Sequence, residues 1–97
     1  LNSIPTKFAL GQNYPNPFNP ITKMDISLPL TGDVNLVIYN ILGQKVRTIF
    51  SGELNYGYHT MQWNGLDDQG LRVSSGVYFS EFRSRDHRKT KKMLLLK

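Results

Sequence analysis

The sequence predicts an all-β fold, an antiparallel sandwich of about seven strands. Short segments that alternate apolar and polar residues recur along the 97 residues, and glycine-containing turn pairs separate them at short intervals. No segment keeps a 3.6-residue apolar period for three turns, so no helix is expected. The length indicates a single domain with a modest core.

The first half of the chain supplies the first strands of this sandwich. Residues 8–10 are a short candidate strand, and residues 22–28 alternate strictly between apolar and polar side chains. Residues 34–38 repeat this alternation, and residues 44–50 end in an apolar pair. The side chains expected to face the core are Met24, Ile26, Leu28, Val34, Leu36, Ile38 and Val46.

Three further strands are expected in the second half. Residues 59–63 place His59, Met61 and Trp63 on one face, before an Asn-Gly turn. Residues 77–82 are aromatic and β-branched, and residues 90–96 close the chain.

The turn before residues 77–82 refines the fold class. Tyr78 enters its strand just after a turn, an arrangement that resembles the tyrosine corner of Greek-key sandwiches. With Tyr78 pointing inward, Ser80 and Phe82 also face the core, while Phe79 and Glu81 lie outside. The sandwich is therefore expected to be immunoglobulin-like, with Trp63 as the large ring packed near Tyr78.

Residues 13–22, Asn-Tyr-Pro-Asn-Pro-Phe-Asn-Pro-Ile-Thr, hold three of the five prolines. A proline cannot donate to a ladder of strand hydrogen bonds, so this segment cannot be a central strand. We expect an edge or lead-in segment that runs over the core, with Tyr14 and Phe18 as plugs. The prolines are expected to deny a pairing edge to other chains.

The net charge of +5 is concentrated near the C-terminus. Residues 83–97 contain seven basic residues and one acidic residue, a local charge of +6, and the remaining residues carry a balance of −1. A charged edge strand that resists sheet-to-sheet association explains this pattern. Nucleic-acid binding is not expected, because no signature of a nucleic-acid module is present.

The sequence offers little catalytic or metal-binding chemistry. Cysteine is absent and histidine occurs only as His59, in a strand, and His87, in a basic turn. Asp67 and Asp68 fit the start of a tight turn better than a calcium loop, since the alternating oxygen ligands and closing glutamate of such a loop are missing. We therefore expect no enzyme activity, cofactor or metal. No window approaches the roughly 18 apolar residues of a membrane-spanning helix.

Several motifs follow one another in a fixed order. They are Leu-Gly-Gln-Asn-Tyr-Pro-Asn-Pro-Phe-Asn-Pro at 10–20, Val-Ile-Tyr-Asn-Ile-Leu-Gly-Gln-Lys-Val-Arg at 37–47, Gly-Tyr-His at 57–59, Trp-Asn-Gly-Leu-Asp at 63–67, Ser-Gly-Val-Tyr-Phe at 75–79 and Thr-Lys-Lys-Met-Leu-Leu-Leu-Lys at 90–97. Together they resemble the type A C-terminal sorting domain of proteins exported by the bacterial type IX secretion system. They are also similar to the immunoglobulin-like domain of flagellar hook-capping proteins. The resemblance covers residues 8–97 and leaves residues 1–7 as the end of a linker from an upstream cargo domain.

The resemblance implies a non-catalytic domain at the C-terminus of a cargo protein from a Bacteroidetes-like bacterium. Such cargo reaches the periplasm by a signal peptide and then crosses the outer membrane through the type IX machinery. The implied partners are the translocon, shuttle and sortase-like proteins of that machinery. A sortase-like peptidase commonly removes the domain, and the cargo stays at the cell surface or is released outside the cell. Direct membrane insertion is not implied.

The resemblance also assigns residues. The family's sorting signal is concentrated in the final strand, here Lys91, Lys92, Met93, Leu94, Leu95, Leu96 and Lys97. The structural motifs contain Tyr14, Pro15, Asn16, Pro17, Phe18, Trp63, Gly65, Asp67, Gly76 and Tyr78. A terminal strand with an exposed backbone edge can be captured by strand addition, so we expect residues 91–97 to dock as a strand on a receptor. Lys92 and Lys97 would then steer the domain toward an acidic surface.

Two alternatives from other classes stay open. The chain could be an immunoglobulin-like carbohydrate-binding or spacer module of a secreted polysaccharide-degrading enzyme, with Tyr56, Tyr58 or Trp63 as the sugar platform. It could also have a structural role, as in hook capping. The first predicts polysaccharide binding, and the second predicts self-assembly or a flagellar partner.

Overall fold

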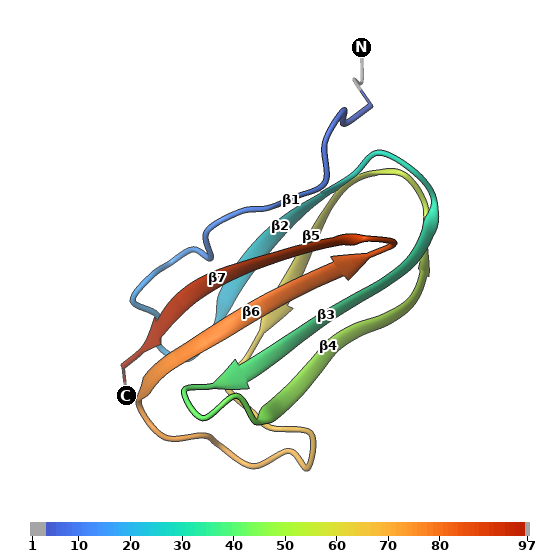
Figure 1. The fold of residues 1–97 in the computed structure, drawn as a ribbon. Helices are drawn as coiled ribbons and strands as arrows, with labels where there is room; N and C mark the ends of the chain where they lie inside the picture. The colour runs from blue at the N-terminus through green and yellow to red at the C-terminus, as the bar shows by residue number, and fades with distance from the viewer. Residues whose placement is uncertain (1–3, 97) are drawn as a thin grey trace.

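A computed structural model describes residues 4–96 and contains two antiparallel sheets packed face to face (Figure 1). The strands are β1 (Ala9–Leu10), β2 (Thr22–Leu28), β3 (Gly32–Asn40), β4 (Lys45–Leu54), β5 (Gly57–Trp63), β6 (Gly76–Ser84) and β7 (His87–Leu95). One sheet has the order β1-β2-β5 and the other β4-β3-β6-β7. The predicted all-β sandwich of seven strands is confirmed. Residues 4–96 include no helix that could cross a membrane.

The core lies between the two sheets and is built by the predicted alternation. In β2, for example, Met24, Ile26 and Leu28 are buried, while Lys23 and Asp25 are exposed. The buried apolar side chains are Leu10, Phe18, Met24, Ile26, Leu28, Val34, Leu36, Val37, Ile38, Trp63, Tyr78, Phe82, Met93 and Leu95. Because side chains in a strand alternate between faces, one periodic pattern fixes both the strand and the side that it buries.

Several strands extend beyond their predicted ends. β4 continues to Leu54, and β6 and β7 form a hairpin in which Ser84 lies opposite His87. The two-residue turn between them places Arg85 in the left-handed region, with φ 55°. This conformation costs a non-glycine residue about 1 kcal/mol or more. The Arg85 guanidinium donates a hydrogen bond to the Thr31 carbonyl oxygen (2.9 Å), which helps to hold the turn.

The proline-rich segment places one of its two aromatic rings in the core and the other on the surface. Phe18 is a plug, as predicted, with 2% of its surface exposed and its ring 5.6 Å from that of Trp63. The prediction for Tyr14 is wrong, because its side chain is 46% exposed. Tyr14 pairs through its backbone with Lys23, and opposing residues of an antiparallel pair share a face. Since Lys23 points to solvent, Tyr14 does so too.

Asn13 and Thr22 form a buried polar cluster that the sequence reading did not foresee. The Asn13 amide donates to Thr22 Oγ1 (2.9 Å) and to the Pro15 carbonyl oxygen (3.2 Å), and the Thr22 hydroxyl donates to the same carbonyl (3.0 Å). Both side chains are almost fully buried. A buried polar group is tolerated when its hydrogen bonds are satisfied, so this cluster fixes the start of the proline-rich segment against β2.

Candidate functional site at the C-terminal strand

β7 carries the predicted sorting signal and divides into a basic half and an apolar half. The four basic residues Arg88, Lys89, Lys91 and Lys92 are all exposed. In the apolar half the side chains of Met93 (0% exposed) and Leu95 (2%) belong to the core, while Leu94 is half-buried and Leu96 is 49% exposed. Lys97 lies outside the described residues. The predicted signal is therefore partly a set of core side chains and partly an exposed surface.

β7 is the last strand of its sheet, so one side of its backbone has no neighbouring strand. Residues 12–18, here called the strap, cover part of this edge. The Phe18 amide donates to the Leu94 carbonyl and the Leu96 amide donates to the Phe18 carbonyl, both at 3.0 Å. The Leu94 amide donates to Asn16 Oδ1 (3.0 Å), and the Gln12 side-chain amide donates to the Lys92 carbonyl (2.8 Å).

The strap closes the C-terminal half of the β7 edge. The Leu94 amide and carbonyl and the Leu96 amide already have partners within the domain. The expectation of a docking edge along residues 91–97 is therefore wrong for this half, because strand addition there would first have to displace the strap. The prolines themselves do not explain the closure, since Asn16 and Phe18 lie between them and supply the hydrogen bonds.

The basic half of the β7 edge is open in the sense that no described strand is hydrogen-bonded to it, although β1 lies near it. Backbone groups point outward at every second residue of an edge strand, so the outward positions before Leu94 are Lys92, Thr90 and Arg88. In the described part of the chain, the strap reaches only the Lys92 carbonyl among them. At the far end of this stretch the Phe8 ring stacks on His87, with centroids 3.9 Å apart. The open stretch thus runs from Arg88 to Lys92.

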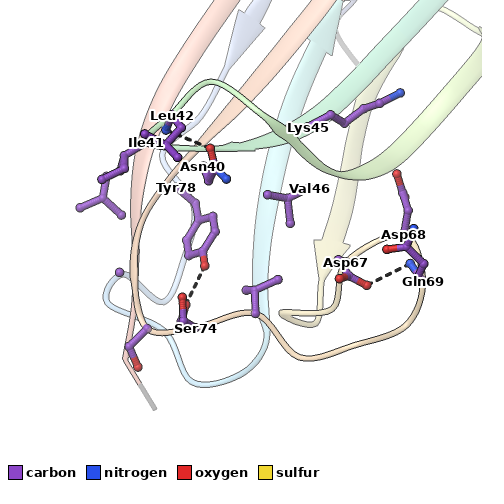
Figure 2. A pocket seen from close by; sticks show the side chains of 14 residues that line it. Asn40, Ile41, Leu42, Lys45, Val46, Asp67, Asp68, Gln69, Ser74 and Tyr78 are labelled. Carbon is purple, nitrogen blue, oxygen red and sulfur yellow. Dashed lines mark hydrogen bonds between the residues drawn. The ribbon is translucent and has the colours of Figure 1, made fainter.

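A second feature is a groove of about 610 Å³ at one end of the sandwich (Figure 2). It lies between the turn after β3 and the loop that joins β5 to β6, and Val46 and Tyr78 are among the residues that line it. Exposed Ile41 and Leu42 border it, with 69% and 77% of their surfaces accessible.

The polar side chains of this groove hold its loops. Asp67 Oδ1 accepts hydrogen bonds from the Gln69 and Leu71 amides, both at 2.9 Å, as the tight-turn prediction requires. Asp68 Oδ1 accepts from the Thr48 amide at 3.0 Å. Residues 4–96 contain no group of three or more His, Asp or Glu side chains that could hold a metal ion.

The tyrosine corner is confirmed beside the groove. The Tyr78 hydroxyl donates to the Ser74 carbonyl oxygen at 2.7 Å, as Figure 2 shows. The Tyr78 ring meets that of Trp63 edge-on, 5.3 Å between centroids, and Trp63 Nε1 donates to the Leu66 carbonyl at 2.9 Å. Since Trp63 is 1% exposed, it cannot form a sugar platform in the folded domain.

Gly65 brings the turn after Trp63 close to the end of the proline-rich segment. Its φ of +77° is left-handed, and a Cβ there would lie 3.4 Å from the Pro20 carbonyl oxygen and 4.0 Å from Leu95 Cδ2. Two motifs far apart in the sequence therefore meet at one point, next to the final strand. Glycine suits this point because it accepts the left-handed backbone and the close approach.

Tyr14 has a distinct environment on the outer face of β2. Its hydroxyl donates to Asp25 Oδ1 (3.0 Å), which also accepts a hydrogen bond from the Thr60 hydroxyl (2.6 Å). The hydrogen bond to the Asp25 carboxylate, together with desolvation and the carboxylate charge, raises the pKa of Tyr14 above its ordinary value of 10.0. The cluster is a surface contact that positions the strap.

The strand order and the tyrosine corner define an immunoglobulin-like β-sandwich domain. The sequence profile of the FlgD Ig-like domain matches residues 22–83, more than half of the chain. The chain therefore belongs to the FlgD Ig-like domain family. No curated protein matches it.

Solved structures with the same fold include one of FlgD and two of proteins from Porphyromonas gingivalis. FlgD from P. aeruginosa is 28% identical, with a TM-score of 0.60, over 76% of this chain and 58% of that chain. Dimeric latent PorU from Porphyromonas gingivalis is 18% identical, with a TM-score of 0.68, over 95% of this chain and 10% of that chain. PorZ, an essential surface component of the type IX secretion system of the same species, is 22% identical, with a TM-score of 0.55, over 93% and 11%. At these identities the likenesses to PorU and PorZ establish the fold, and this chain spans about a tenth of their lengths.

Proposed function

We propose that this chain is a non-catalytic C-terminal sorting domain that directs an upstream cargo domain through the outer membrane by the type IX secretion system. In this proposal residues 1–7 end the linker and residues 8–97 form the domain. The cargo passes through the periplasm and arrives at the cell surface or outside the cell, and a sortase-like peptidase removes the domain. The partners are the translocon, shuttle and sortase-like proteins of that machinery.

The observation that carries the proposal is the pairing of the strap with β7. Both carry motifs that resemble sorting domains, and both lie outside residues 22–83, the range that matches the FlgD family. The fold shared with PorU covers 95% of the chain, which leaves out only about five residues and so includes most of the strap and β7. The support for a sorting role therefore comes from the strap and β7, and residues 22–83, which match the FlgD family, do not contribute to it.

The residues of the proposed signal fall into a buried group and an exposed group. Met93 and Leu95 are buried, so a receptor of the folded domain cannot contact them. Lys91, Lys92 and Leu96 are exposed, and we assign the recognition of the machinery to them. This division makes the signal testable with substitutions that leave the core intact.

The test is a secreted reporter fused ahead of residue 1 and expressed in a Bacteroidetes species with an intact type IX system. The complete domain is expected to bring the reporter to the surface, where added protease digests it. Deletion of residues 94–97 should leave it in the periplasm. Because this deletion removes buried Leu95, Leu96→Glu is the sharper variant, and Leu42→Glu, at an even more exposed leucine in the turn after β3, is its control.

The expected result is periplasmic retention for Leu96→Glu and normal delivery for Leu42→Glu. Circular dichroism of the purified domains must show the same β-sheet spectrum for both variants. Surface delivery of the wild-type fusion in a strain without the translocon, or normal delivery of the deletion variant, would overturn the proposal.

The FlgD likeness favours a second candidate, a structural Ig-like module that acts by assembly. This role predicts that the purified domain associates with itself or with a flagellar protein at micromolar concentration. Sedimentation equilibrium separates the two candidates, since sorting needs no self-association. The polysaccharide-binding alternative retains only exposed Tyr56 and Tyr58, at 54% and 62%, as its platform.

A further inference from the structure

The open stretch of the β7 edge combines unpaired backbone groups with a dense positive charge. Within the described residues, the outward amides and carbonyls of Arg88 and Thr90 have no hydrogen-bond partner. Four cations surround them, and the ion pair between Arg88 and the half-buried Glu81 is weak, with 3.8 Å between Arg88 Nε and Glu81 Oε2. Unpaired strand edges pair readily with another extended chain, and natural proteins usually blunt them.

We propose that this stretch, residues 88–92, binds an extended acidic segment of a partner protein by strand addition. The proposal rests on the edge geometry, and its binding test does not require the sorting function, although Lys91 and Lys92 belong to both proposed surfaces. The partner backbone would bond to the outward groups of Arg88 and Thr90 and to the Lys92 amide. Phe8 bounds the site at one end and Gln12, bonded to the Lys92 carbonyl, at the other.

The distribution of cations over the two faces of β7 defines the partner's chemistry. Arg88 and Lys92 lie opposite Arg83 and Phe79, on the outer face of the sheet. Lys89 and Lys91 lie on the other face and are nevertheless exposed. Successive side chains of an added strand alternate between the same two faces. An added strand therefore meets positive charge on both faces, which favours consecutive or closely spaced Asp and Glu residues.

A second copy of this chain fits the edge poorly. Pairing of two β7 edges would place the cations of one strand beside those of the other, and like charges directly opposite one another destabilise a strand pair. The strap also prevents the pairing from extending past Lys92 into the apolar half. Pairing of two β7 edges is therefore disfavoured, and pairing with a short acidic segment is favoured.

The experiment uses the 97-residue chain and a fluorescein-labelled heptapeptide with acidic side chains on both faces, acetyl-Thr-Glu-Glu-Val-Glu-Glu-Thr-amide, followed by fluorescence anisotropy and by ¹⁵N chemical shifts. The control peptide replaces the central Val by Pro, which keeps the charge and prevents strand pairing. We expect saturable binding of the first peptide, with shift changes centred on residues 88–92. The affinity for the proline peptide should be at least about tenfold lower.

Two protein variants test the two components of the site. Thr90→Pro removes an outward amide that β6 does not use, so the β6–β7 ladder is kept and binding should fall by about tenfold. Lys89→Glu/Lys91→Glu should weaken binding by a similar factor, while Lys45→Glu/Arg47→Glu on β4, with the same change in net charge, should not.

Several results would overturn the proposal. No saturation up to about 1 mM peptide would exclude a useful site. Equal binding of the Val and Pro peptides would mean charge attraction without strand addition. Equal losses for the β4 and β7 charge variants would mean that net charge alone attracts the peptide. If Thr90→Pro fails to fold, the peptide pair still decides between these outcomes.

Discussion

Replacing Phe18 by Ala tests whether the strap is an integral part of the core. Phe18 is 2% exposed and packs on Trp63, and its own backbone carries two of the hydrogen bonds to β7. Truncating a buried Phe to Ala costs about 3–5 kcal/mol through lost transfer free energy and the remaining cavity. A domain of this size has a total stability of about 5–15 kcal/mol. The variant should therefore lose a large share of its stability and melt roughly 15–30 °C lower.

The assay is urea unfolding followed by circular dichroism and by the fluorescence of Trp63, the single tryptophan of the chain. The matched control is Tyr14→Ala in the same strap, whose hydrogen bond to Asp25 is exposed to solvent, so this variant should lose much less stability than Phe18→Ala. The Leu94 and Leu96 amides should also exchange faster with solvent in Phe18→Ala. A loss below about 1.5 kcal/mol, or equal losses in the two variants, would refute the view that Phe18 anchors the strap.

Three further changes probe other contacts. Tyr78→Phe removes the hydrogen bond to the Ser74 carbonyl and should cost about 1–2 kcal/mol in thermal or urea unfolding, whereas no measurable loss would mean that the corner is only a packing feature. Gly65→Ala forces a left-handed alanine beside the Pro20 carbonyl and should cost about 1–2 kcal/mol or more by the same measurement, and an unchanged midpoint would contradict the strain argument. Tyr14→Phe should lower the alkaline sensitivity of stability: because the folded-state pKa is raised above 10.0, the stabilisation by Tyr14 is present below that pH and disappears as pH rises through the raised value. Unfolding followed from pH 9 to 12 checks this, and identical curves for the variant and the wild type would contradict it.

The strands and their buried faces could be predicted because both depend on one local property. A strand of period two buries every second residue, so the alternation at Met24, Ile26 and Leu28 already names the core face. Tyr78 and its corner were predictable because the turn and strand that create them are adjacent in sequence. Local patterns thus supplied most of the sandwich.

The site could not be predicted in the same way, because its contacts join the two ends of the chain. The Asn16 hydrogen bond to the Leu94 amide spans 78 positions, and the Gln12 bond to the Lys92 carbonyl spans 80. The periodicity of apolar residues within a strand cannot predict contacts between residues so far apart in the sequence. Tyr14 was misplaced for a related reason: its aromatic ring suggested burial, but its backbone pairing with Lys23 decides the face on which it lies.

The strap also determines how the domain would respond to a pulling force. The described chain enters at one end of the sandwich and leaves at the other, along its longest dimension of 39 Å (Figure 1). A force between the two ends would run along β7 and along the strap beside it. The hydrogen bonds of Phe18 to Leu94 and Leu96 would then be loaded together in shear instead of opening one after another. The contact that closes the edge would thus act as a mechanical clamp between the two ends.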